Sequence, residues 1–254
     1  MSSNLGFAPL LSQHRGLQQI PVLPPDHANV RFLDHMTQQQ LRLKHAHDAS
    51  IKTARIPYIH YVWSGGTSYA KLTGGQHFQV VVASHVAEHV PDLVTWLLQI
   101  SEVLAPTGVL RLVVPDKRYC FDFRRRLSGV ADVVAAYVER RTKPSVASAY
   151  DNAARIPPKY NSARMHWAGS PIDYELTDEL HAAAFARAQR AHEEADWGVH
   201  SWQWTTETFV YQIGVLQRTG LIPLRVRPGS VVPTQPNGLE FMLELEHRAA
   251  LRRE

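Results

Sequence analysis

The chain has 254 residues, of which 44% are hydrophobic and 20% are charged, and its net charge is +4. A chain of this length buries enough apolar surface to fold without disulfides or a structural metal. The single cysteine, Cys120, excludes an internal disulfide and a cysteine-based zinc cluster, and it is typical of a reducing cytoplasm. No apolar run approaches the length of a membrane span, and residues 1–11 lack the pattern of a signal peptide. We therefore expect a cytoplasmic protein without a membrane partner.

The densest basic cluster is Arg124–Arg126, with Lys117 and Arg118 nearby. Proteins that bind nucleic acid carry longer basic stripes with interleaved aromatic residues, so this pattern argues against a nucleic-acid partner. We interpret the cluster as a solvated basic face, and the alternative is a site for an anionic small molecule. The sequence does not indicate an oligomeric state.

The predicted elements begin with a short strand at 29–33 that stops at Asp34, and a helical segment at 37–46 follows it. A second apolar, β-rich run at 56–63 predicts another strand. Residues 1–28 show little periodicity and are interpreted as extended or loop-like chain.

The clearest pattern lies at 78–115. A continuous apolar run at 78–83 is typical of a strand that is buried on both faces of a parallel sheet. Pro91 and Asp92 open an amphipathic helix, a Pro-Thr-Gly run ends it, and the next buried strand covers 109–114. The succession of strand, helix and strand predicts a right-handed parallel crossover unit.

Residues 120–200 carry mostly helical patterns, including an Ala-rich helix that Thr177 caps and that runs to about residue 194. Residues 155–174, before the Ala-rich helix, show an irregular pattern. We interpret 120–200 as a cap insertion over the sheet edge, within one domain that covers 1–254. The wider segment 116–204 is expected to cover the carboxyl ends of the fourth and fifth strands and to define a substrate pocket.

The end of the chain narrows the fold class. Thr205 is placed to cap a helix that Gly220 ends, and a strand is predicted at 221–226. Strict alternation of apolar and polar residues at 239–246 marks a half-exposed, antiparallel strand. The predicted fold is therefore α/β, with a mostly parallel sheet that closes with an antiparallel strand, plus a helical cap insertion.

Three segments resemble one known superfamily. FQVVVASHVAEHVPDL at 78–93 resembles the fourth-strand motif of class I S-adenosylmethionine-dependent methyltransferases, VLAPTGVLRLVVPDKRYCFD at 103–122 their following turn and fifth strand, and HSWQWTTETF at 200–209 the start of the next helix. The order of elements is similar too, because this Rossmann-like sheet ends in an antiparallel hairpin. The nearest resemblance is to bacterial methyltransferases encoded near glycan and glycosyltransferase genes.

The resemblance implies S-adenosylmethionine as cofactor. Asp34 matches the acid that takes both ribose hydroxyls, and the alternative is an Asp that caps the next helix. Ala83, Ser84 and His85 match the loop that passes the methionine end. The best match to the glycine-rich first motif is Asn4-Leu5-Gly6, where almost no strand precedes Gly6. Either the start of the chain is truncated or the cofactor site has decayed.

The expected reaction is methyl transfer to an oxygen or nitrogen of a small polar acceptor, sugar-like or anionic. His85, His200 and Arg118 are the candidate catalytic residues, because the insertion leaves and rejoins the sheet at the rim where ligands bind. A histidine is a suitable base near neutral pH, and an arginine binds carboxylate or phosphate. Tyr160 and His166 are candidates for the roof of the pocket.

Two other functions share these residues. His-Val-Ala-Glu-His at 85–89 matches the pattern of one zinc peptidase class, but that pattern needs a helix, and here it precedes a helix-opening proline. We predict no stoichiometric zinc at His85 and His89. A non-catalytic, methyltransferase-like partner or scaffold protein is the remaining alternative. Cys120 is expected to be packed and not nucleophilic, and Trp202 and Trp204 are expected to pack in the cap.

Overall fold

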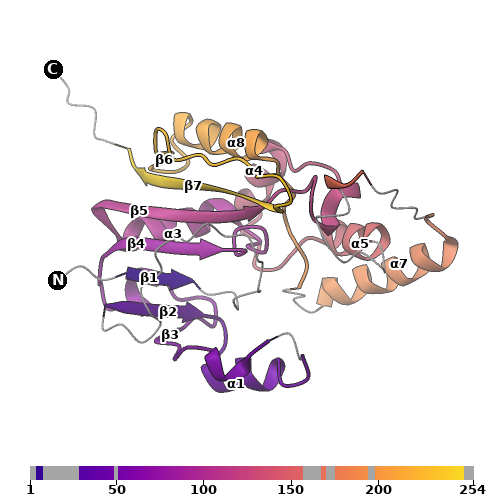
Figure 1. The fold of residues 1–254 in the computed structure, drawn as a ribbon, viewed down its shortest axis with the longest axis horizontal. Helices are drawn as coiled ribbons and strands as arrows, with labels where there is room; N and C mark the ends of the chain where they lie inside the picture. The colour runs from indigo at the N-terminus through magenta and orange to yellow at the C-terminus, as the bar shows by residue number, and fades with distance from the viewer. Residues whose placement is uncertain are drawn as a thin grey trace.

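The computed structural model describes residues 4–7, for which only the backbone is described, and residues 29–48, 51–156, 167–169, 175–193 and 198–248. Seven strands form one sheet in the order β3-β2-β1-β4-β5-β7-β6 (Figure 1). Their bounds are Asn4–Phe7 (β1), Val30–Asp34 (β2), Tyr61–Val62 (β3), Phe78–Ser84 (β4), Leu104–Pro115 (β5), Leu224–Val226 (β6) and Glu240–His247 (β7).

The sheet is parallel from β3 to β5 and antiparallel at its other end. β1 pairs in parallel with β2 and β4, β4 pairs with β5 in the same direction, and β7 runs antiparallel to both β5 and β6. The alternating pattern of β7 is confirmed, since Phe241, Leu243 and Leu245 are buried and the residues between them are half-buried. The predicted fold class is thus confirmed.

The described helices are α1 (Gln38–Lys44), α2 (Tyr69–Leu72), α3 (Leu93–Val103), α4 (Val130–Val138), α5 (Val146–Arg155), α7 (Asp178–Glu193) and α8 (Thr206–Arg218), with short 3₁₀ turns at Thr53–Arg55 and Phe121–Arg124. Both predicted ends of α8 are confirmed. Thr205 accepts a hydrogen bond from the backbone N–H of Thr208, and Gly220 after α8 has a φ of 77°. None of the described helices is long and apolar enough to cross a membrane.

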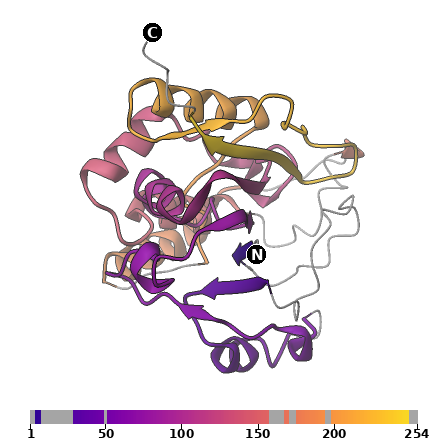
Figure 2. The ribbon, with the colours of Figure 1, turned by 90° about the vertical axis from the view of Figure 1, so that its left-hand side faces the viewer.

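Two apolar clusters lie on the sheet. The larger one joins β4, β5 and β7 to α3, α4 and α8, and its fully buried members include Phe78, Ile100 and Phe209. The smaller one contains Phe32 of β2 and Leu41 of α1. In Figure 2, the helices of 69–103 and 130–138 lie on the same side of the strands.

Three element boundaries differ from the prediction. The helix that the Pro-Thr-Gly run was expected to end already stops at Val103, since Leu104 is the first residue of β5, and the run forms a bulge within that strand. Gly108 is required there, because a Cβ would lie 2.8 Å from the backbone oxygen of Phe78. The runs at 56–63 and 221–226 yield only the short β3 and β6, and β6 begins directly after Pro223, which has no N–H for a ladder.

The predicted insertion divides into two parts. α4 packs against α3, and its Val133 and Ala136 belong to the larger core cluster. α5 and α7 pack on each other and lie beyond the carboxyl ends of the parallel strands (Figure 1). Tyr160 and His166 lie outside the described residues. The described part of the insertion therefore contains both a helix of the core and a helical pair at the predicted edge of the sheet.

Candidate active site

The predicted cofactor residues fall on three neighbouring strands. Gly6 of β1 pairs with Phe32 of β2 and with Val82 of β4. Asp34 is the last residue of β2, and Ser84, which follows the buried Ala83, is the last residue of β4. Ligands of open α/β sheets bind outside the carboxyl ends of the strands, and the topology brings the predicted residues to this edge of the sheet. Their contact with a cofactor stays a prediction.

One oxygen of the Asp34 carboxylate contacts residues of the turn that follows β2. Its Oδ1 accepts a hydrogen bond of 3.0 Å from the backbone N–H of Met36 and lies 2.9 Å from Nδ1 of His35. The cap of α1 itself is Thr37, which accepts from the N–H of Gln40. Asp34 therefore does not cap the helix, and the contacts of its carboxylate within the described structure are all made by Oδ1.

His85 turns the chain at the end of β4. Its φ is 53°, a left-handed value that costs energy for any residue other than glycine. Its backbone N–H still continues the ladder to the Val113 carbonyl, at 2.9 Å. Nε2 lies 2.8 Å from a Glu240 carboxylate oxygen, and Nδ1 lies 3.4 Å from Oε1 of Glu88.

These carboxylates decide the charge of His85. Burial opposes protonation, but the contacts with Glu240 and Glu88 outweigh it and raise the pKa of His85 to about 10. Glu88 is fully buried, and although burial raises its pKa, the neighbouring histidines lower it on balance. At neutral pH His85 is therefore a cation that can donate hydrogen bonds but cannot accept a proton.

His200 follows the insertion and belongs to a buried chain of polar side chains with Asp122 and Arg125. Its Nδ1 is 2.5 Å from Oδ2 of Asp122, whose other oxygen accepts a hydrogen bond of 2.9 Å from Arg125. Arg125 also donates to the His200 carbonyl, at 2.9 Å. Burial raises the pKa of Asp122, but His200 and Arg125 lower it on balance. A histidine whose Nδ1 is held by a carboxylate presents Nε2 as the available nitrogen.

The backbone joins His200 to the end of β4. The N–H of Ser201 donates to the Glu88 carbonyl at 2.6 Å, and the indole of Trp202 donates to the Val90 carbonyl at 2.6 Å. The N–H of Lys117 donates to the Trp204 carbonyl at 2.8 Å. The chain thus returns to the rim through this segment, as predicted. Both tryptophans are buried, but they belong to the larger core cluster and not to the cap.

Arg118 is already paired within the protein. Its guanidinium makes two hydrogen bonds to the carboxylate of the buried Asp116, at 3.0 and 2.7 Å, and lies 3.7 Å from Glu207. These contacts raise the pKa of Arg118, with the Asp116 hydrogen bonds as the main cause. Its predicted role as the anchor of an anionic acceptor therefore has to compete with an existing bidentate ion pair.

Sequence reasoning missed four polar residues of this region: Asp116, Asp122, Arg125 and Glu240. Asp116 directly follows β5, which is the same signal that singled out Asp34. Glu240 was assigned to the exposed face of an alternating strand, and only the fold shows that it reaches His85. Arg125 was placed on a solvated basic face; this was wrong, because its side chain is only 1% exposed and faces Asp122.

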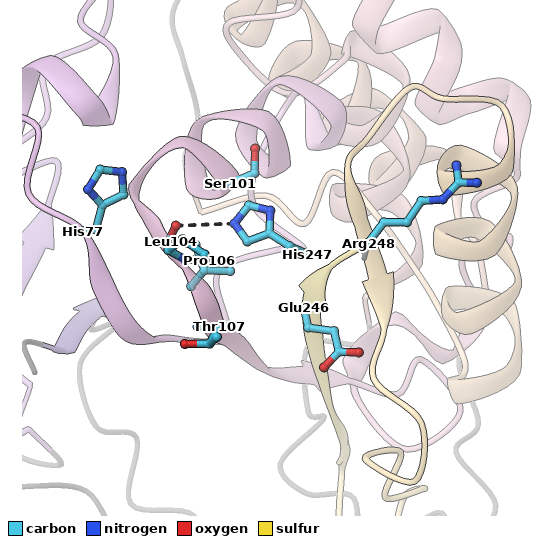
Figure 3. Close-up of a pocket in the computed structure, with 9 residues that line it drawn as sticks. His77, Ser101, Leu104, Pro106, Thr107, Glu246, His247 and Arg248 are labelled. Carbon is cyan, nitrogen blue, oxygen red and sulfur yellow. Dashed lines mark hydrogen bonds between the residues drawn. The ribbon is translucent and has the colours of Figure 1, made fainter. Parts of the chain in front are cut away.

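A depression of about 630 Å³ lies at the opposite edge of the sheet (Figure 3). Its lining includes His77 before β4, Leu104 at the start of β5 and His247 at the end of β7. Nε2 of His247 lies 3.4 Å from the Leu104 carbonyl. These are the amino ends of the parallel strands, away from the edge that binds ligands in such sheets, so this depression is separate from the candidate site.

The strand order and the antiparallel β7 define the class of fold: it is that of class I S-adenosylmethionine-dependent methyltransferases. No family model and no curated protein matches the chain. Similar solved structures include a protein from Rhodobacter sphaeroides described as a Zn-dependent alcohol dehydrogenase, with 12% identity, coverage of 87% of this chain and 76% of that one, and a TM-score of 0.42.

Methyltransferases are also among the similar structures. Mitomycin 7-O-methyltransferase MmcR is 11% identical, with 97% of this chain covered and a TM-score of 0.39, and this chain spans about half (49%) of its length. The plantazolicin methyltransferase BpumL, solved with S-adenosylhomocysteine, is 9% identical, with 97% of this chain and 77% of that one covered and a TM-score of 0.40. Likenesses at this level say nothing about chemistry, and the class of fold rests on the strand order.

Proposed function

We propose that the chain binds S-adenosylmethionine at the carboxyl edge of its sheet and transfers the methyl group to an oxygen or nitrogen of a small polar acceptor. The observation that carries the proposal is the strand order β3-β2-β1-β4-β5-β7-β6, with Asp34 ending β2 and His85 following β4. This arrangement places an acid and a polar turn on either side of β1, as the binding of a nucleoside that carries an amino acid requires.

The residues present fit the cofactor at Asp34. Both of its contacts with described residues use Oδ1, so Oδ2 remains to accept a hydrogen bond from a ribose hydroxyl. Ser84 and His85 are placed to pass the amino-acid end. When bound, the sulfonium supplies an electrophilic methyl group, and the task of the protein is mainly to orient the two reactants.

The charges at the rim favour an uncharged acceptor, such as a sugar-like hydroxyl compound, over an anion. Arg118 is neutralised by Asp116, and the protonated His85 is held by Glu240 and Glu88. Arg118 and His85 are therefore both already paired with carboxylates of the protein and are poorly suited to bind the carboxylate or phosphate of an acceptor. His200, oriented through Nδ1 by its buried carboxylate partner, is the candidate base for a hydroxyl acceptor, with Nε2 as the accepting atom.

Calorimetric titration with S-adenosylhomocysteine tests the proposal. Asp34→Asn keeps an oxygen for the Met36 N–H but removes the charge, so the fold should persist while binding weakens by about 1.5–3 kcal/mol, roughly 10- to 150-fold in Kd. Glu102→Gln, at an exposed position of α3, is the matched control and should bind like the parent. Equal affinity of Asp34→Asn and parent would refute the assignment of Asp34.

The second candidate is a non-catalytic partner or scaffold protein with a methyltransferase fold. The specific observation in its favour is the first motif: β1 has four residues, and Gly6 is the only glycine among residues 1–15. The same titration separates the two functions. Absence of heat and of a thermal shift at millimolar S-adenosylmethionine and S-adenosylhomocysteine would reject the enzyme and leave the scaffold protein.

A further inference from the structure

Three potential metal ligands meet beside the candidate active site. Glu88 and His89 follow β4, and His200 comes from the segment that returns to the rim; one ligand atom of each residue lies within 4.8 Å of the other two. Glu88 is 0% exposed and His200 is 5% exposed. The hydrogen bond from Ser201 N–H to the Glu88 carbonyl fixes the two segments against each other.

The Glu88 carboxylate is the strongest sign of a missing ligand. Both of its oxygens are buried, and neither accepts a hydrogen bond from any residue that the structure describes. Its nearest cationic or imidazole nitrogens are Nδ1 of His85 at 3.4 Å and Nε2 of His89 at 4.0 Å. The protonated His85 offsets part of the Glu88 charge, but a buried carboxylate whose oxygens accept no hydrogen bond from the described residues is still costly, and a metal ion would satisfy these oxygens.

His200 has the outer contacts that histidine ligands usually have. Its Nδ1 is held by Asp122 at 2.5 Å, and Asp122 is itself held by Arg125. A carboxylate that takes the proton of one imidazole nitrogen fixes the tautomer and leaves the other nitrogen as a ligand. The ring of His89 stands edge-on to that of His200, with the centroids 4.5 Å apart.

We propose that Glu88, His89 and His200 bind a divalent transition-metal ion of the zinc type. Two imidazoles and one carboxylate form a ligand set of catalytic zinc sites, which leave a fourth position for water or substrate, whereas Mg²⁺ and Ca²⁺ prefer oxygen ligands. The site is not the His-x-x-Glu-His site of the zinc peptidases, because His85 pairs with Glu240 and has a left-handed backbone. For His89, the proposal replaces the expectation from the sequence that no zinc binds there.

This inference goes beyond the proposed function, since ion binding requires neither S-adenosylmethionine nor an acceptor. It also changes the role of His200. If His200 held an ion through Nε2, its imidazole would not be available as a base, and the ion would supply a more acidic bound water in its place.

The test is a Zn²⁺ titration of the metal-stripped full chain against a chromophoric chelator, with no cofactor present. We expect one Zn²⁺ per chain in the parent, and binding weakened at least about tenfold in Glu88→Gln and in the partly exposed His89→Ala. Asp122→Asn, which removes the charge behind His200 and also the partner charge of Arg125, should weaken it by about 10- to 100-fold in the folded variant. His77→Ala, at the opposite edge of the sheet, is the control and should bind like the parent.

A second measurement does not depend on the variants. Co²⁺ added to the parent should give visible absorption bands of a low-coordinate site, and Zn²⁺ should remove them. Circular dichroism shows whether each variant is folded. The proposal is overturned if the parent binds no Zn²⁺ at a free Zn²⁺ concentration about 100 times the dissociation constant of the chelator. It is also overturned if folded Glu88→Gln and His89→Ala bind Zn²⁺ like His77→Ala. Cofactor titration of the same samples reports separately on the proposed function.

Discussion

Two adjacent arginines allow a direct test of how burial sets the worth of an ion pair. Arg125 and Arg126 each pair with an aspartate, Asp122 and Asp132. The side chains of the first pair are 1% and 2% exposed, whereas those of the second are 68% and 28% exposed. Replacement of each arginine by Met keeps an unbranched apolar stem and removes the guanidinium, with its charge and its hydrogen bonds.

Arg125→Met should lower the free energy of unfolding by about 3–5 kcal/mol, because it leaves a buried carboxylate without its cation. The variant also removes the hydrogen bonds that Arg125 donates to the Ser148 carbonyl, at 3.2 Å, and to the His200 carbonyl, which keeps a second donor in Gln203. Arg126→Met should cost at most about 1 kcal/mol, since an exposed pair is solvated and screened.

The assay is urea unfolding of both variants and the parent, followed by tryptophan fluorescence and circular dichroism, with midpoints compared at constant slope. Moderate salt should reduce the difference in the free energy of unfolding between Arg126→Met and the parent. The difference for Arg125→Met should not change, because a buried ion pair is screened much less. Costs within about 1 kcal/mol of each other would refute the argument and return Arg125 to the solvated basic face that the sequence suggests.

Two further predictions concern local contacts. Asp92 caps α3 by accepting from the Thr95 N–H at 2.9 Å and from its hydroxyl at 2.6 Å, so Asp92→Ala should cost about 0.5–2 kcal/mol and Asp92→Asn clearly less in the same urea assay. Burial raises the pKa of the Cys120 thiol well above its usual value, so a disulfide reagent at pH 8 should modify it at least about tenfold more slowly in the native protein than in denaturant. Equal rates would show that Cys120 is exposed.

The carboxyl edge of the sheet combines two groups of residues with different tasks. Asp34 and Ser84 lie where a nucleotide-like cofactor is expected, and their positions follow from the ends of strands. The polar chain of Asp122, Arg125 and His200 is formed by the insertion and has no counterpart in the strand pattern. The first group bears on the identity of the cofactor and the second on the chemistry beside it, so the two can be tested independently.

The sequence by itself determined the elements whose signals are local. The apolar run of β4, the alternation of β7 and the cap at Thr205 each depend on residues within a few positions of one another, and all three are confirmed. Together with the order of the elements they were enough for the class of fold. The weaker runs that gave β3 and β6 are shorter in the structure than the sequence predicts, and at β6 the strand begins directly after Pro223.

Only the tertiary structure decided which polar residues meet. His200 and Asp122 are 78 positions apart, and His85 and Glu240 are 155 positions apart, so no periodicity relates them. Burial is likewise a property of the packed chain: in a run of three arginines, the middle one is enclosed and the next is solvated. The sequence thus placed His85 and His200 at one rim, and the fold alone set their charge partners, because electrostatic environment depends on neighbours in space and on the exclusion of water.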